Sequence, residues 1–254
     1  MKIGCCASIE QAQKLYEAGY DFIECTVVSL IPEKSDEEFA EVFKQYENSP
    51  LPVEAFNVLL PGDLKIVGPE VDQERIKKYM EVALARVKQI GGDTVVFGSG
   101  DARTYVNDDF PRGKAEEQII DFLNISAPIA EALGIMIVIE PLNQGESNII
   151  NSVPEAVQFA KKVNHPSVQV LADFYHMDEE NEPLENIVTS RTYVKHIHVA
   201  DTGRLAPGTG KYPYGEFVDC VNRANYKGRI SIECDWENFD QEIKQAREYL
   251  VSLF

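Results

Sequence analysis

The feature that most constrains the fold of this chain is an eightfold alternation of short apolar runs with longer amphipathic stretches. The apolar runs are strand-like and span 2–7, 21–27, 52–60, 93–99, 135–143, 168–176, 193–201 and 229–236. The stretches with helical spacing span 8–20, 35–49, 72–92, 114–134, 152–164, 181–190, 214–226 and 240–254. Nearly continuous apolar runs are typical of parallel strands that are covered on both faces.

Eight strand–helix units in 254 residues predict an α/β protein of the (β/α)₈ barrel type. A doubly wound sheet is the rival fold, but it would place a GxGxxG turn after the first strand, where this chain reads CCASIEQ. No linker or low-complexity tract interrupts the alternation, so we expect residues 1–254 to form a single domain. Pro128 predicts a kink or a break in the fourth long helix.

Composition restricts the partners and the compartment. The chain carries 42 acidic and 24 basic residues, a formal net charge of −18 that argues against nucleic acid and anionic membranes as partners. It has five cysteines, an odd number, and no CxxC pair, which favours small buried thiols in a reducing compartment. The N-terminus turns polar at once and no apolar run approaches about 18 residues, so we expect a soluble cytoplasmic protein.

Ligand-type side chains end four consecutive predicted strands. The four residues are Glu140, Asp173, His198 and Glu233. The active sites of (β/α)₈ barrels lie at the C-terminal ends of the strands, where these side chains can converge. Three carboxylates and one imidazole suit Mn²⁺, Mg²⁺ or Co²⁺, and without a cation the carboxylates would repel one another. We therefore expect a divalent metal site here.

Other polar residues near these strand ends are candidates for substrate contact. His196 and His198 face the same way in their strand, but His198 lies nearer its end, so we expect His196 to be a core histidine with satisfied hydrogen bonds. His176 follows its strand in what we expect to be a loop over the site. Arg204 and Glu146 lie in the seventh and fifth loops, and the alternative for each is an ordinary surface residue.

The motifs IVIEPLN, LADFYHM, HIHVAD and SIECDW resemble the xylose-isomerase-like TIM barrel superfamily, and the pattern is most similar to ketose 3-epimerases of the D-tagatose and D-psicose type. This resemblance implies one divalent metal, Mn²⁺ first with Co²⁺, Mg²⁺ or Zn²⁺ as alternatives, and a homodimer or homotetramer. It implies that the metal ligands are Glu140, Asp173, His198 and Glu233 and that the acid/base pair is Glu140 and Glu233. It also implies that the substrate-binding residues are Glu146, His176 and Arg204.

The implied activity belongs to carbohydrate metabolism. It is the isomerisation or epimerisation of a small ketose through a metal-stabilised enediolate. The same four ligands would also serve an inosose-type dehydratase or a hydroxypyruvate-type isomerase, so these alternatives stay open. A phosphorylated sugar would need cations, and the candidates are Arg103, Arg204 and Lys211. A sugar-binding barrel without catalysis is a weaker alternative.

An apurinic-site endonuclease, which belongs to the same superfamily, fits this chain poorly. That enzyme needs further histidines from the early strands, whereas the third and fourth strands here end in Asn57 and Gly98. The seventh loop reads GTGKYPY and lacks an Asp-x-His motif. The connection over 57–71 has no clear counterpart in the superfamily; it is either a lid with Gly62 and Gly68 as hinges or a surface loop. A second long connection spans 100–113.

Overall fold

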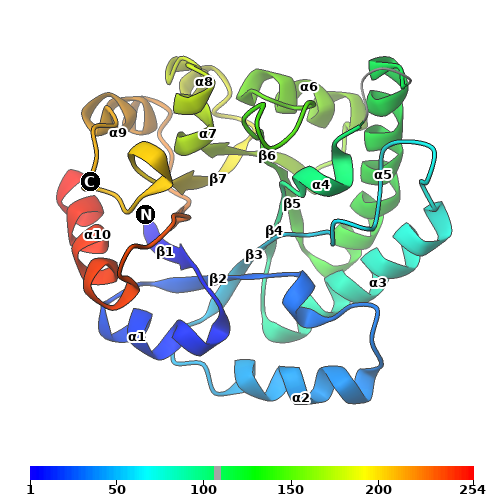
Figure 1. Ribbon diagram of the computed structural model, residues 1–254, viewed down its shortest axis with the longest axis horizontal. Helices are drawn as coiled ribbons and strands as arrows, with labels where there is room; N and C mark the ends of the chain where they lie inside the picture. The colour runs from blue at the N-terminus through cyan, green and yellow to red at the C-terminus, as the bar shows by residue number, and fades with distance from the viewer. Residues whose placement is uncertain (106–109) are drawn as a thin grey trace.

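The computed structural model, which describes residues 1–105 and 110–254, is a closed barrel of parallel strands in the order β1 to β8, with helices around the outside (Figure 1). This confirms the predicted (β/α)₈ fold. The strands are β1 (Lys2–Cys6), β2 (Phe22–Thr26), β3 (Val53–Asn57), β4 (Thr94–Phe97), β5 (Met136–Ile139), β6 (Val168–Asp173), β7 (Val194–Val199) and β8 (Arg229–Ile232). β8 pairs with β1 and closes the barrel.

The helices of the described residues follow the predicted order. They are α1 (Ala12–Glu17), α2 (Asp36–Glu47), α3 (Gln73–Ile90), α4 (Gly100–Arg103), α5 (Arg112–Leu133), α6 (Val153–Val163), α7 (Phe174–Glu179), α8 (Glu185–Thr189), α9 (Tyr214–Arg223) and α10 (Phe239–Leu253). Short 3₁₀ turns are η1 (Ile9–Gln11), η2 (Val28–Leu30) and η3 (Thr202–Arg204). No helix in this part of the chain is both long and apolar enough to cross a membrane.

Apolar packing between strands and helices holds the barrel together. The ring of Phe97 on β4 lies 4.9 Å from that of Phe122 on α5, and both side chains are buried. The interior of the barrel is not wholly apolar, because Glu24, His196, His198 and Ser231 are completely buried as well. A buried polar group without a partner destabilises the fold, so we expect these four side chains to form hydrogen bonds inside the barrel.

Two predicted elements differ from the structure. The apolar run 168–176 is strand only as far as Asp173, the predicted strand end, because the Asp173 carboxylate accepts hydrogen bonds from the backbone of Tyr175 and His176 and starts α7 there. Of the kink or break predicted at Pro128, the break does not occur, since α5 continues through this residue to Leu133. Packing of Ala127 and Ala130, both buried, outweighs the backbone hydrogen bond that proline cannot donate.

The connection over 57–71 is not a simple surface loop. Its apolar residues Leu59, Leu64 and Ile66 are almost completely buried. Tyr79 of α3 donates a hydrogen bond to the Leu59 carbonyl, and Gln118 of α5 makes two hydrogen bonds to the backbone of Gly68. These contacts fasten the segment to the helices and argue against a freely opening lid. The connection over 100–113 contains α4, and its residues 106–109 lie outside the described part of the chain.

Candidate metal centre and substrate cavity

Four side chains from four consecutive strands meet at the C-terminal mouth of the barrel. Glu140, Asp173, His198 and Glu233 each offer one ligand atom, and these atoms all lie within 4.8 Å of one another. The Nδ1 atom of His198 is 3.2 Å from Glu140 Oε1, 3.5 Å from Glu233 Oε2 and 3.9 Å from Asp173 Oδ2. The structure thus brings together the residues that the sequence indicated as a metal set.

Strand register accounts for this convergence. Asp173 on β6 pairs directly with His198 on β7, so the two side chains emerge at the same level. Glu140 and Glu233 each follow the last residue of a strand, and their backbone N–H groups donate to the carbonyls of Phe97 and Val199 on the neighbouring strands. The carboxylates are therefore fixed at the mouth by sheet hydrogen bonds that extend one residue past each strand.

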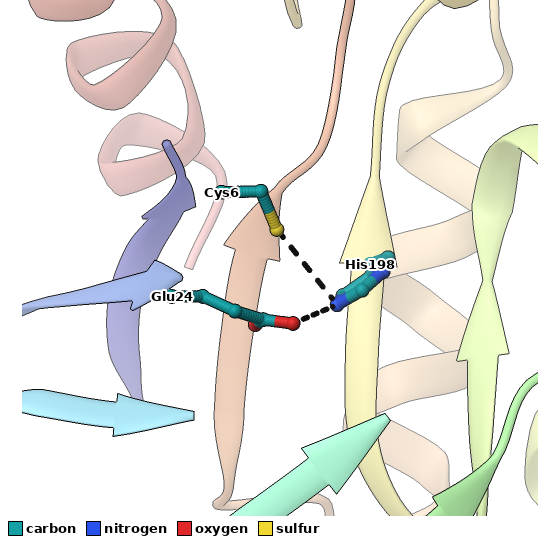
Figure 2. A group of neighbouring side chains, drawn as sticks. All are labelled: Cys6, Glu24 and His198. Carbon is teal, nitrogen blue, oxygen red and sulfur yellow. Dashed lines mark hydrogen bonds and ion pairs between the residues drawn. The ribbon is translucent and has the colours of Figure 1, made fainter. Parts of the chain in front are cut away.

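On its other side, His198 faces a carboxylate that the sequence analysis missed. The Nε2 atom of His198 lies 2.9 Å from Glu24 Oε1 and 4.0 Å from Cys6 Sγ, and the three side chains point toward one another (Figure 2). The second oxygen of Glu24 is 2.8 Å from His196 Nε2. An acidic residue in the middle of the apolar stretch FIECTV was the signal that could have identified Glu24.

His196 is buried in the core, as expected, but its hydrogen bonding is only half complete. Nε2 reaches Glu24, whereas Nδ1 is buried without a partner among the described residues. Burial lowers the pKa of His196, although the Glu24 carboxylate acts in the opposite direction. Burial alone would raise the pKa of Glu24, but the charges and hydrogen bonds of the two histidines bring it well below its usual value.

The electrostatics of the mouth fit a cation. Burial, with help from Glu233, raises the pKa of Glu140, and burial raises the pKa of Asp173 to about 6. Glu233 is buried too, but the charges of His198 and Arg204 lower its pKa to about 2. Three carboxylates thus lie close together around one imidazole nitrogen, and a divalent ion would remove the repulsion between their negative charges. Three oxygen donors and one nitrogen donor also suit such an ion.

His176 lies on helix α7 and not in a loop, because Asp173 caps that helix. Its Nδ1 atom accepts a hydrogen bond of 3.1 Å from the backbone N–H of Asn143, and burial lowers the pKa of the ring. A neutral ring that accepts at Nδ1 carries its proton on Nε2. This Nε2–H is buried and has no partner in the described part of the chain; it lies 4.0 Å from Glu146 Oε2.

Arg204 spans the mouth on the turn η3. Its guanidinium donates to Glu146 Oε1 at 2.8 Å and to Glu233 Oε2 at 3.0 Å, and it lies 4.9 Å from the centre of the Tyr175 ring. Asn57, at the end of β3, donates to the other oxygen of Glu233 at 2.8 Å. Sequence reasoning did not assign Asn57 a role at the site. Together these donors hold both oxygens of the Glu233 carboxylate.

The prediction that Arg103 could contact a phosphate is wrong. Arg103 is completely buried, and its guanidinium donates to the backbone carbonyls of Phe97, Glu140 and Ile150. It therefore fastens the ends of β4 and β5 to the fifth loop. Lys211 is exposed and lies outside the cavity lining described next.

A cavity of about 420 Å³ opens beside the four ligand-type residues. Residues from the ends of β3, β4, β5 and β8 and from η3 line it. Its charged and amide side chains are Asn57, Asp101, Glu140, Glu146, Arg204 and Glu233. Apolar residues such as Val58, Leu60 and Leu142 form another part of the wall. The volume falls in the range of small-molecule sites.

Comparison with known proteins places this architecture in a family. The family described as xylose isomerase-like TIM barrel matches residues 12–253, which confirms the resemblance drawn from the motifs. The chain is 28% identical to D-psicose 3-epimerase of Agrobacterium fabrum over 228 residues, 87% of this chain and 77% of that enzyme. It is 31% identical to D-psicose 3-epimerase of Ruminiclostridium cellulolyticum over 118 residues, 46% of this chain and only 40% of that enzyme.

The solved structures agree with the barrel. A crystal structure of D-psicose 3-epimerase in the presence of D-fructose superposes with a TM-score of 0.88 and covers 100% of this chain and 99% of that one. The sequence identity over this superposition is 20%, so the likeness establishes the shared fold.

Proposed function

Because this chain belongs to the xylose isomerase-like TIM barrel family, we propose that it is an isomerase that inverts a carbon next to the carbonyl of a small ketose. One observation carries the proposal. Two carboxylates, Glu140 and Glu233, approach the same point at the mouth of the barrel, 3.2 and 3.5 Å from His198 Nδ1. The curated relatives named D-psicose 3-epimerase support the choice of a ketose as substrate.

The two glutamates are suited to opposite halves of a proton exchange. Hydrogen bonds from Asn57 and Arg204 hold both oxygens of Glu233 at the mouth, which positions this carboxylate as the base that removes a proton beside the carbonyl. Glu140 lies 3.2 Å from His198 Nδ1 at the same point of the mouth, from which it would return a proton to the other face.

The donor set fits one divalent ion, and we propose Mn²⁺ first, with Co²⁺, Mg²⁺ or Zn²⁺ as alternatives. Its holders would be Glu140, Asp173, His198 and Glu233. When bound, such an ion supplies Lewis-acid polarisation of the substrate carbonyl and makes the neighbouring C–H more acidic. Around it, the residues of the chain orient the sugar and move the protons.

The cavity favours an uncharged sugar over a sugar phosphate. Glu146 in the lining offers carboxylate oxygens to hydroxyl groups, and the His176 Nε2–H 4.0 Å from it has no hydrogen-bond partner among the described residues, so it can donate to a hydroxyl or carbonyl oxygen. Arg204, the cation in the described lining, is already paired with two carboxylates. A phosphate would have to displace one of those carboxylates and meet Asp101, Glu140 and Glu146 in the same cavity.

Isotope exchange tests the proposed function. We expect the Mg²⁺-loaded protein in D₂O to place deuterium next to the carbonyl of an unphosphorylated ketose, as followed by proton NMR. The product then identifies the outcome: an epimer, an aldose, or a dehydrated compound from an inosose. Absence of exchange with ketoses, ketose phosphates and inosose would contradict the proposed chemistry.

The role of Glu233 has its own test. We expect Glu233→Gln to lower the exchange rate at saturating Mg²⁺ by about 10²–10⁴-fold, because a positioned acid or base contributes that much. Glu237→Gln is the matched control, since Glu237 is exposed and lies outside the cavity lining. An exchange rate in Glu233→Gln equal to that of the control would refute the assignment of Glu233 as the base.

A further inference from the structure

Glu24 is a fully buried carboxylate that the proposed reaction does not use. It lies on β2, inside the barrel, and its side chain is inaccessible to solvent. Three groups from two other strands surround it: His196 and His198 on β7 and Ser231 on β8. A buried carboxylate with several donors is held in one orientation, which makes it suited to orient a neighbour in turn.

The hydrogen bonds of Glu24 determine which nitrogen of His198 is available to a metal. An ionised carboxylate only accepts, so the Nε2 atom of His198, 2.9 Å from Glu24 Oε1, must carry a proton. The lone pair that a metal needs can then come only from Nδ1. Nδ1 is the nitrogen that faces Glu140, Asp173 and Glu233.

We propose that Glu24 is the positioning residue of the metal centre: it accepts the Nε2–H of His198 and so presents Nδ1 to the ion. This inference rests on the metal site of the proposed function. Carboxylates that orient a metal-binding histidine typically change metal affinity by about 10–100-fold when they are replaced. Glu24 itself touches neither ion nor substrate.

Glu24 is held in turn by donors on its second oxygen. The Ser231 hydroxyl donates to Oε2 at 2.6 Å, and His196 Nε2 lies 2.8 Å from the same atom. Ser231 pairs with His198 in the register of β7 and β8, so the barrel brings both to the level of Glu24. The two histidines, two residues apart on β7, therefore have different roles. His198 faces the mouth, and His196 supports the Glu24 carboxylate that orients His198.

A rival arrangement uses the same side chains differently. Cys6, Glu24 and His198 also form a three-donor group in which Nε2 would be the ligand (Figure 2). The thiol sulfur lies 4.0 Å from Nε2, at the long limit of a hydrogen bond to sulfur, whereas Glu24 Oε1 lies at 2.9 Å. Replacement of Cys6 therefore distinguishes the two arrangements. It should weaken binding of an ion held by Cys6, Glu24 and His198 Nε2, but not of an ion held through His198 Nδ1.

Metal titration of three proteins is the first experiment. We expect Glu24→Gln, which keeps the shape but not the charge, to weaken binding of Mn²⁺ by about 10–100-fold in calorimetry. We expect Cys6→Ala to bind Mn²⁺ like the wild-type protein. Unchanged affinity in Glu24→Gln, or an equal loss in both variants, would overturn the proposal.

A second measurement needs no substitution of Glu24 and remains decisive if Glu24→Gln does not fold. The chain has only four histidines, so ¹⁵N NMR of the protein loaded with diamagnetic Mg²⁺ or Zn²⁺ can resolve each ring. We expect His198 to carry its proton on Nε2, and Cys6→Ala to keep that tautomer. A proton on Nδ1 of His198 would overturn the proposal.

Neither readout depends on a substrate, so the two proposals can fail separately. A protein that binds Mn²⁺, shows the Nε2–H tautomer and gives no isotope exchange would contradict the proposed function alone. Normal exchange with unchanged metal affinity in Glu24→Gln would contradict the role of Glu24 alone. A wild-type protein that binds none of these ions would overturn both.

Discussion

Gly98 shows how a single residue can make room for the site. It follows β4 at the mouth of the barrel, and a Cβ atom added there would overlap the Oε2 atom of Glu140. The Glu140 carboxylate is buried and lies 3.2 Å from His198 Nδ1, so moving it aside would carry it away from the other ligand-type residues. A residue without a Cβ atom is therefore needed at position 98, because the Glu140 carboxylate occupies the space that a Cβ atom would fill.

We predict that Gly98→Ala reduces both metal affinity and exchange activity, because the new methyl group displaces the Glu140 carboxylate. Binding of Mn²⁺ by calorimetry and deuterium exchange measure the two effects. Gly113→Ala is the control, since no atom of the described residues lies within 4 Å of a Cβ added at that position. Activity in Gly98→Ala equal to that of the control would show that the site tolerates the methyl group.

At the scale of elements, helix α2 carries the clearest local signal in the sequence. The Ser35 hydroxyl accepts from the Glu38 N–H at 3.2 Å, and the Glu38 carboxylate accepts from the Ser35 N–H at 3.0 Å. This is the capping box that the sequence indicates, and three acidic residues in the first turn add to it through the helix dipole. The start of α2 is therefore stabilised by contacts within four residues.

We predict that Ser35→Ala lowers the free energy of unfolding by about 1 kcal/mol, the usual loss for a helix cap. For a chain of this size the melting temperature should fall by about 2–4 °C, with exchange activity unchanged. Ser8→Ala is a matched control, because Ser8 precedes η1 without a side-chain cap hydrogen bond. Equal melting temperatures for the two variants would mean that the box contributes nothing to stability.

At the scale of the whole molecule, the mouth of the barrel concentrates negative charge in a chain that is already acidic. The formal net charge is −18, and four carboxylates, those of Glu24, Glu140, Asp173 and Glu233, lie around His198. Folding brings these groups together from distant parts of the sequence. A cation that binds only the folded barrel should therefore stabilise all of it.

We predict that Mn²⁺ or Mg²⁺ raises the melting temperature and that EDTA reverses the change. At a free-ion concentration of 100 times the dissociation constant, the gain should be about 2.7 kcal/mol. Thermal unfolding followed by circular dichroism measures it, and Glu140→Gln should lose most of the gain. A melting temperature that responds neither to the ions nor to EDTA would contradict the metal centre.

The sequence by itself determined the elements, their order and the end of the barrel where chemistry can occur. Periodicity and caps are local, so the apolar runs and the Ser35–Glu38 box could be read without a structure. The strand ends also pointed to Glu140, Asp173, His198 and Glu233, which the structure places together. Local signals were less useful where packing overrides them, as in the continuous helix through Pro128.

Only the tertiary structure decided how each site residue is held. Glu24 meets His198 across 174 positions of the chain, and Asn57 meets Glu233 across 176. Arg103 is buried rather than exposed at the surface, and its guanidinium donates to backbone carbonyls. These contacts arise when the sheet closes on itself and its first and last strands become neighbours. No pattern along the chain encodes that proximity, because it depends on the register and curvature of all eight strands together.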